Sequence, residues 1–131
     1  MPSTGHTILA LVLASEYVLG GLGRVSAVPF SALNERIFQK SIKTAPHPSP
    51  VFPFTDVQSP KTVRLHMLVV GALMITEGIL LLSPATRAMS GTLGLGCFLT
   101  VAGAWSQMRA GLKYWLPLVN FGLAWAVWAL D

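Results

Sequence analysis

Residues 63–83 read VRLHMLVVGALMITEGILLLS, and this stretch decides the fold class of the chain. It is apolar over most of its length, and Pro84 directly after it is a residue that ends helices. An α-helix of about 20 apolar residues spans the hydrocarbon core of a bilayer. The sequence therefore predicts a membrane-spanning helix over residues 63–83.

Three further stretches have the length and apolar character of a membrane span, at residues 8–27, 89–108 and 112–130. The connections at 84–88 and 109–111 are short, so the helices that they join must run antiparallel. A long polar connection, residues 28–62, follows the first span. We therefore predict a single domain over residues 1–131, an all-α membrane protein built as a four-transmembrane-helix up-down bundle.

The composition agrees with a membrane protein. Of the 131 residues, 53% are hydrophobic and 11% are charged, against about 25% charged in a soluble domain. The net charge of +4 comes without a basic stripe interleaved with aromatic residues, so we expect no nucleic-acid partner. Cys97 is the single cysteine, which excludes an intrachain disulfide and a paired-thiol redox site. The histidines lack ligand-like spacing, and we expect neither a metal nor a cofactor.

The basic residues predict the topology. The positive-inside rule places the long connection 28–62 in the cytosol and both termini outside or in the lumen, as in a multi-pass protein of the endoplasmic reticulum if the source is eukaryotic. No basic residue precedes the first apolar stretch, and Glu16 lies within it, so we expect a retained helix rather than a cleaved signal peptide. Arg87 is the one Lys or Arg residue predicted on the opposite side of the membrane. The cations on the cytosolic side are Arg24, Arg36, Lys40, Lys43, Lys61, Arg64, Arg109 and Lys113.

The long connection contains two patterned segments. Residues 31–42 carry apolar side chains at helical spacing, which predicts an interfacial helix with its apolar face among the lipid headgroups. Residues 45–54 are rich in proline and therefore extended. Phe52 and Phe54 alternate along this second segment. They would either close the bundle as a lid or hold a solvated loop at the membrane surface.

Polar residues inside the apolar layer are the candidates for function. A charged residue at the bilayer centre costs about 2.5–3.5 kcal/mol, and it marks a functional site by default. Glu16 and Glu77 qualify, and at about 1.5 Å per residue their depths differ by only about 3 Å. Thr100 and Asn120 lie near the centres of their helices. All four residues are expected in one layer of the bundle.

The helical periodicity gives each predicted span one face that combines small residues with a polar group. Small residues let helix backbones approach closely, and polar groups pair across helix interfaces. We expect these faces to meet inside the bundle, where glycines either bring helices into contact or leave room for a ligand. The four faces are Glu16, Gly20, Gly23 and Ala27; His66, Val70, Leu73 and Glu77; Gly96, Thr100, Gly103 and Gln107; and Lys113, Pro117, Asn120 and Ala124.

Two carboxyl groups at one depth favour acid–base chemistry, because close carboxyls share a proton and divide the roles of acid and base. We predict that Glu16 and Glu77 form this catalytic pair. The reaction would be isomerisation, cyclisation or epoxide opening of an apolar, terpenoid- or polyketide-like substrate in a biosynthetic pathway, without a cofactor. The expected substrate-binding residues are Tyr17, Thr100, Gln107 and Asn120 around substrate oxygens, and His66 and Arg109 at the cytosolic mouth.

Other interpretations of the same residues stay open. The carboxylates could act as hydrogen-bonding groups that fix helix register, or as steps on a proton or ion path. The second function class is a non-enzymatic assembly factor or chaperone that grips partner helices through its small-residue faces. In either case a homo-oligomer in the lipid bilayer is expected. A polar cavity containing Glu16 favours the enzyme, and tight contact between helices 8–27 and 89–108 favours the assembly factor.

Three segments resemble the DoxX-like family of small four-helix membrane proteins. These are GALMITEGILLLSPATRAMSG (71–91), GGLGRVSAV (20–28) and VAGAWSQMRAGLKYWLPLVNFGLAWAVWAL (101–130). The resemblance implies the four-helix fold. The family is functionally mixed, with quinol-oxidase-associated subunits, receptor-assembly chaperones and proteins near natural-product pathways. Glu77 matches its pattern, which implies an architectural role, whereas Glu16 is not part of that pattern and points to a property of this chain.

Overall fold

The computed structural model describes residues 4–28, 31–44 and 60–130. Within these ranges the chain forms five helices and no strand, which confirms the all-α class. Four of the helices correspond to the predicted spans, with ends that differ by a few residues. The proposed lid residues Phe52 and Phe54 lie outside the described residues. The helices are α1 (Thr4–Val25), α2 (Ser31–Thr44), α3 (Pro60–Leu82), α4 (Ser90–Arg109) and α5 (Trp115–Ala129).

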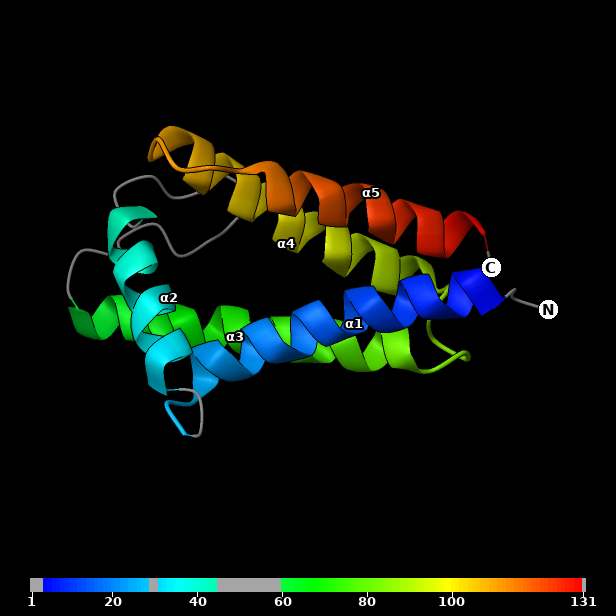
Figure 1. Cartoon of the computed structure of the whole chain (residues 1–131), viewed down its shortest axis with the longest axis horizontal. Helices are drawn as coiled ribbons and strands as arrows, with labels where there is room; N and C mark the ends of the chain where they lie inside the picture. Colours follow the sequence, from blue (N-terminus) through cyan, green and yellow to red (C-terminus); the bar gives the residue numbers. More distant parts are fainter. Residues whose placement is uncertain (1–3, 29–30, 45–59, 131) are drawn as a thin grey trace.

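The long helices form two antiparallel pairs, α1 with α3 and α4 with α5 (Figure 1). The pairs meet at the end of the molecule near the chain termini. There the His6 Nε2 atom of α1 donates a hydrogen bond of 2.8 Å to the carbonyl of Val127 on α5. At the opposite end the pairs diverge, and α2 lies across that end in contact with α1, α3 and α4.

Glycines allow the close contact between α1 and α3. A Cβ atom added to Gly21 would lie 2.7 Å from the carbonyl oxygen of Gly71, and one added to Gly71 would lie 2.9 Å from that of Gly21. Further along the pair, a Cβ on Gly78 would lie 3.1 Å from the Ala14 carbonyl oxygen. Backbones approach this closely only where side chains are absent. Gly20 and Gly21 of α1 therefore serve packing against α3, whereas Gly23 packs against Leu33 and Ile37 of α2.

A buried apolar cluster holds the two pairs together at the end near the termini. It draws on α1, α3 and α5 and leaves little room between them. Its leucine and valine side chains each gain about 1.5–3 kcal/mol from removal from water, if the reference is an aqueous chain. The α1–α3 pair and the α4–α5 pair consequently lie apart only at the end of the molecule that carries α2. The buried members are Ala10, Leu13, Ala14, Tyr17, Leu81, Ala124 and Val127.

The turn after α3 is fixed by side chains that bind its last carbonyl groups. Thr86 Oγ1 donates to the Leu80 carbonyl at 2.6 Å, and Arg87 Nε donates to the Leu81 carbonyl at 3.0 Å. The last four carbonyls of a helix have no partner within that helix, so these bonds satisfy groups that would otherwise be exposed. Arg87, the single cation expected on this side, is thus buried in the turn.

The predicted helix over residues 31–42 is confirmed as α2, but its apolar face packs against the protein. Phe38 is buried against Val63 and Met67 of α3. Asn34 Nδ2 donates a hydrogen bond of 2.8 Å to the carbonyl of Gly23, near the end of α1. The expectation that this face lies among headgroups is therefore wrong, because Val63 and Met67 near the start of α3 offer it an apolar surface.

Two helices in the described ranges are long and apolar enough to cross a membrane, α1 (Thr4–Val25) and the Val63–Leu82 part of α3. Helix α5 is apolar but has 15 residues, about 22 Å of helix against a hydrocarbon core of about 30 Å. Length and composition thus support membrane association through α1 and α3. Four spans stay a prediction.

Candidate functional site

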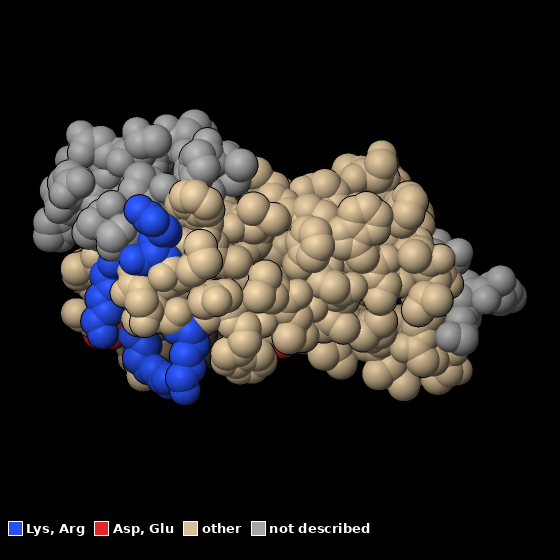
Figure 2. All heavy atoms as spheres, turned by 90° about the horizontal axis from the view of Figure 1, so that it is seen from above, with Lys and Arg blue, Asp and Glu red and all other residues tan. Residues whose placement is uncertain are grey.

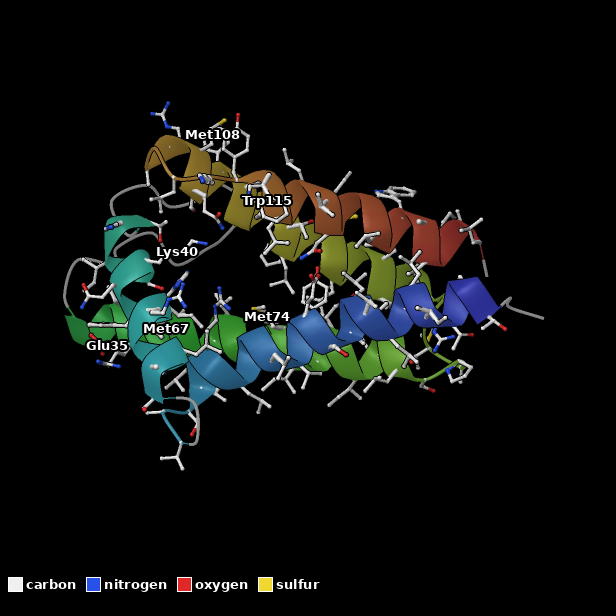
Figure 3. All side chains as sticks on the ribbon, viewed as in Figure 1. Glu35, Lys40, Met67, Met74, Met108 and Trp115 are labelled. Atoms are coloured by element: carbon white, nitrogen blue, oxygen red, sulfur yellow. The ribbon has the colours of Figure 1, made fainter. Side chains whose placement is uncertain are left out.

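A partly enclosed cavity of about 420 Å³ lies between the two helix pairs, on the side of α2. All five helices contribute to its lining. Its volume falls within the range of about 300–1,000 Å³ that is typical of small-molecule sites. In Figure 3, Met74 of α3 and Lys40 of α2 project into the space between the pairs, and both residues line the cavity.

The four small-and-polar faces predicted from helical periodicity all reach this cavity. Most of their members lie in its lining, which confirms that the faces converge. The contribution of α2 was not predicted, because residues 31–42 were expected to face the lipid. The lining members of the four faces are Glu16 and Gly20 from α1; His66 and Val70 from α3; Thr100, Gly103 and Gln107 from α4; and Pro117 and Asn120 from α5.

Glu16 is the one carboxylate among the described residues that line the cavity, and its side chain is exposed. The neighbouring Tyr17 is only 4% exposed, and its hydroxyl has no hydrogen-bond partner within the described ranges. On the opposite wall, the Oδ1 atom of Asn120 is also buried and has no hydrogen-bond partner within the described ranges. Thr100 differs, since its hydroxyl donates to the Gly96 carbonyl of its own helix at 2.8 Å. Tyr17 and Asn120 thus line the cavity, and each carries a buried polar atom without a hydrogen-bond partner in the described ranges.

Glu77 lies outside this lining. The side chain is 0% exposed, and a Cβ on Gly96 of α4 would lie 3.0 Å from its Oε1 atom. Gly78, the next residue, packs against Ala14 and Val18, the two α1 residues that bracket Glu16. The two carboxyl groups thus lie at one level, as expected from depth. They do not face the same space, since Glu16 lines the cavity and Glu77 is packed between α3 and α4.

The cations at the cavity differ from those predicted. His66 lies in the lining, whereas Arg109, at the end of α4, is exposed and outside it. Arg24 and Lys40 take its place in the lining. Arg24 continues the ridge of Glu16 and Gly20 at intervals of four residues, which places it on the same side of α1. This spacing was the signal that could have identified Arg24 as a site residue, rather than as a charge that only sets topology.

Figure 2 shows Lys and Arg side chains gathered at one end of the molecular face it presents, and other residue types over the rest of that face. The cations of α2, which are Arg36, Lys40 and Lys43, belong to this end of the molecule. A second, more open hollow outside the helix pairs is lined by α2 together with Leu112 and Lys113. The end of the molecule that carries α2 is thus strongly basic.

Lys40 is held near a second positive charge. Partial desolvation of its ammonium group, and secondly the charge of Arg24, lower the pKa of Lys40 from its ordinary value. The unfolded chain therefore binds the Lys40 proton more tightly than the folded chain does. It follows that the Lys40 charge destabilises the fold at neutral pH, and that this effect is lost as the pH rises toward about 10.4, where an unfolded lysine also loses its proton.

Lys40→Gln is accordingly expected to raise the thermal unfolding temperature slightly at neutral pH, because solvent screens the charge of this exposed side chain. The gain should shrink as the pH approaches about 10.4. Circular dichroism melts of the purified protein at a series of pH values measure both effects. Lys43→Gln, on the same helix but outside the cavity lining, is the matched control and should give no gain. A gain for Lys40→Gln that grows with pH would contradict this assignment.

No protein-family model, curated protein sequence or solved structure matches this chain. Function must therefore be argued from the cavity itself. Its features are one exposed carboxylate at Glu16, unpartnered polar atoms on Tyr17 and Asn120, and cations at the end toward α2.

Proposed function

We propose that the chain is a cofactor-independent membrane enzyme that acts in this cavity on an apolar, terpenoid- or polyketide-like substrate. The reaction is acid–base isomerisation, cyclisation or epoxide opening. The supporting observation is that Glu16 lines the cavity together with Tyr17 and Asn120, each of which carries a buried polar atom without a hydrogen-bond partner in the described ranges. A base and hydrogen-bonding groups in one partly enclosed space are the minimum that a proton-transfer reaction needs.

In the simplest version Glu16 moves one proton. Its carboxylate removes a proton from one carbon of the substrate and returns the same proton to another carbon, so that the product is an isomer and no atom is gained or lost. The Tyr17 hydroxyl donates a hydrogen bond to the substrate oxygen on which negative charge develops. Gln107 and Asn120, on the opposite wall, orient the substrate. Cyclisation and epoxide opening use the same groups, with proton donation as the first step.

This mechanism uses one carboxylate in the cavity and not the pair predicted from the sequence. Glu77 is separated from the lining by its packing between α3 and α4. We assign it an architectural role at this helix contact, which is also what the resemblance to DoxX-like proteins implies.

We further propose that α1, α3, α4 and α5 all lie in the bilayer, with α2 and its cations at the cytosolic face, in the endoplasmic reticulum membrane if the source is eukaryotic. Apolar side chains exposed on the outer surfaces of all four helices support this arrangement, since large apolar patches are rare on soluble monomers. Examples from each helix are Ile8, Leu11, Val12 and Leu19; Leu65 and Ile79; Val101 and Trp105; and Leu118, Val119 and Trp125.

The second candidate is a non-enzymatic assembly factor. It is favoured by Gly94 and Gly122, where an added Cβ has no atom of the described residues within 4 Å, so that small-residue surfaces on α4 and α5 are open to a partner helix or a second copy. An assembly factor would be favoured most by tight contact between the small-residue faces of α1 and α4. A cavity separates these two faces instead.

The test of the enzyme is conversion by the purified full chain in lipid vesicles. The vesicles are loaded with an extract of apolar metabolites from the source cells and analysed by chromatography and mass spectrometry. We expect a compound to be replaced by one of equal mass, or by one heavier by a water molecule after epoxide opening, with wild type and not with Glu16→Gln. Equal conversion by both proteins would overturn the assignment of Glu16. Absence of any conversion by the wild type would favour the assembly factor.

A further inference from the structure

The cavity has different chemistry at its two ends. Arg24, Lys40 and His66 come from three different helices and line the end toward α2. Toward the other end the lining is formed by apolar side chains such as Met74 and Leu99, and by the proposed reaction centre at Glu16. Glu16 and Arg24 are eight residues apart on α1, which separates the two ends by about 12 Å along the helix.

Arg24 and Lys40 have no ion pair with a carboxylate in the described part of the chain. Arg24 Nη1 donates to the backbone carbonyl of Gly20 at 3.1 Å, a bond within its own helix. The described ion pair nearest in sequence to Lys40 joins Glu35 to Arg64 at 3.9 Å, and neither of those residues lines the cavity. Positive charges brought together from α1 and α2 repel each other, and after desolvation the charge of Arg24 is the second cause that lowers the pKa of Lys40. An anion between them would remove this cost.

We propose that the cavity binds an amphiphile with an anionic head, and that Arg24 and Lys40 hold this head while the apolar tail extends toward Glu16. The inference rests on the proposed function, for which it defines the substrate class. The head is a phosphate or a carboxylate, since both groups accept hydrogen bonds from guanidinium and ammonium groups. His66 and the hydroxyls of Ser41 and Thr44 complete the polar end of the lining.

The length and polarity of the cavity argue for an amphiphile rather than a free anion. A phosphate ion would occupy only the end near Arg24 and Lys40, and the apolar lining from Val70 to Met74 would stay unused. A molecule that fills both parts places its head at the cations and a reactive group about 12 Å away, at the level of Glu16. The head then fixes which bond of the tail meets the carboxylate, and this geometry would give the enzyme its regiospecificity.

The test measures equilibrium binding to the full chain in phosphatidylcholine nanodiscs. The probes are farnesyl phosphate, farnesol and inorganic phosphate, which separate the contributions of head and tail. We expect wild type to bind farnesyl phosphate at least tenfold more tightly than farnesol, and inorganic phosphate only weakly. Arg24→Gln and Lys40→Gln should each reduce this preference about tenfold. Lys43→Gln, from the same helix but outside the lining, should leave it unchanged.

Each outcome decides the inference. Equal affinity for farnesyl phosphate and farnesol, or an equal effect of Lys43→Gln and Lys40→Gln, would overturn it. Inorganic phosphate that competes as well as its farnesyl ester would assign the cations to a free anion instead. Lys40→Gln keeps the test decisive if Arg24→Gln does not fold, because the Lys40 side chain is exposed. Glu16→Gln should retain the preference for the phosphate head, so loss of conversion without loss of this preference would separate the two proposals.

Discussion

Glu16→Gln is expected to lower the rate of conversion of the apolar substrate by about 10²–10⁴-fold, which is the usual contribution of a positioned general acid or base. Glutamine keeps the size and hydrogen-bonding capacity of the side chain but cannot accept the substrate proton. Because Glu16 is exposed to the cavity, its replacement should leave the unfolding temperature unchanged. Initial rates in vesicles and circular dichroism melts on the same preparations measure the two quantities.

Glu77→Gln is the matched control, since it makes the same chemical change at the same level of the bundle. Glu77 is packed between α3 and α4 and lies outside the cavity lining, so the conversion rate should fall less than tenfold. If Glu77→Gln instead removed as much activity as Glu16→Gln, the two carboxyls would act as a pair. The mechanism with a single carboxylate would then be wrong.

Gly71→Ala is expected to lower the free energy of unfolding by about 1–3 kcal/mol, the usual cost of overpacking a tight contact. The new Cβ would lie 2.7 Å from Val25 Cγ1, 2.9 Å from Arg24 Cβ and 2.9 Å from the Gly21 carbonyl oxygen. The last of these atoms belongs to the backbone and can move only if α1 and α3 separate. Thermal or denaturant unfolding in detergent measures the loss.

Gly122→Ala makes the same substitution where the structure offers open space. In the part of the chain that the structure describes, no atom lies within 4 Å of a Cβ added at Gly122 of α5. Alanine favours a helix over glycine by about 0.5–1 kcal/mol, so this variant should be as stable as wild type or more so. Opposite signs at Gly71 and Gly122 are therefore expected. Equal effects at both positions would mean that α1 and α3 do not approach each other as described.

Much of the site was predictable because helical periodicity fixes which side chains share a face. Glu16 and Gly20, Thr100 and Gly103, and Asn120 with Pro117 were grouped from their spacing alone, and all of them line the cavity. The all-helical class followed from four long apolar stretches. The level shared by Glu16 and Glu77 followed from the rise per residue and the antiparallel direction of their helices.

The periodicity could not predict which neighbour each face meets. Gly21 and Gly71 bring α1 onto α3, and this contact turns Glu77 toward Gly96 while Glu16 keeps the open side. The inward packing of Phe38 on α2 likewise depends on the space left where α1 and α3 diverge from α4 and α5. Such contacts join residues far apart in the sequence, and local pattern carries no information about them.

The proposal that the cavity is the site of ligand binding can be tested by filling it. A Cβ added at Gly103 of α4 would meet Gln107 and Pro117 at ordinary distances of 3.8 Å, and all three residues line the cavity. Gly103→Phe should therefore occupy the cavity without disturbing the helices. Gly94→Phe, on the same helix, extends into open space and is the matched control.

Binding of farnesyl phosphate to these two variants is the most direct measurement. We expect Gly103→Phe to weaken binding by at least about 100-fold at an unchanged unfolding temperature, because a tail and a phenyl ring cannot share about 420 Å³ with the head group in place. Gly94→Phe should bind like wild type. Undiminished binding by Gly103→Phe, or an equal loss in Gly94→Phe, would show that the ligand does not enter this cavity.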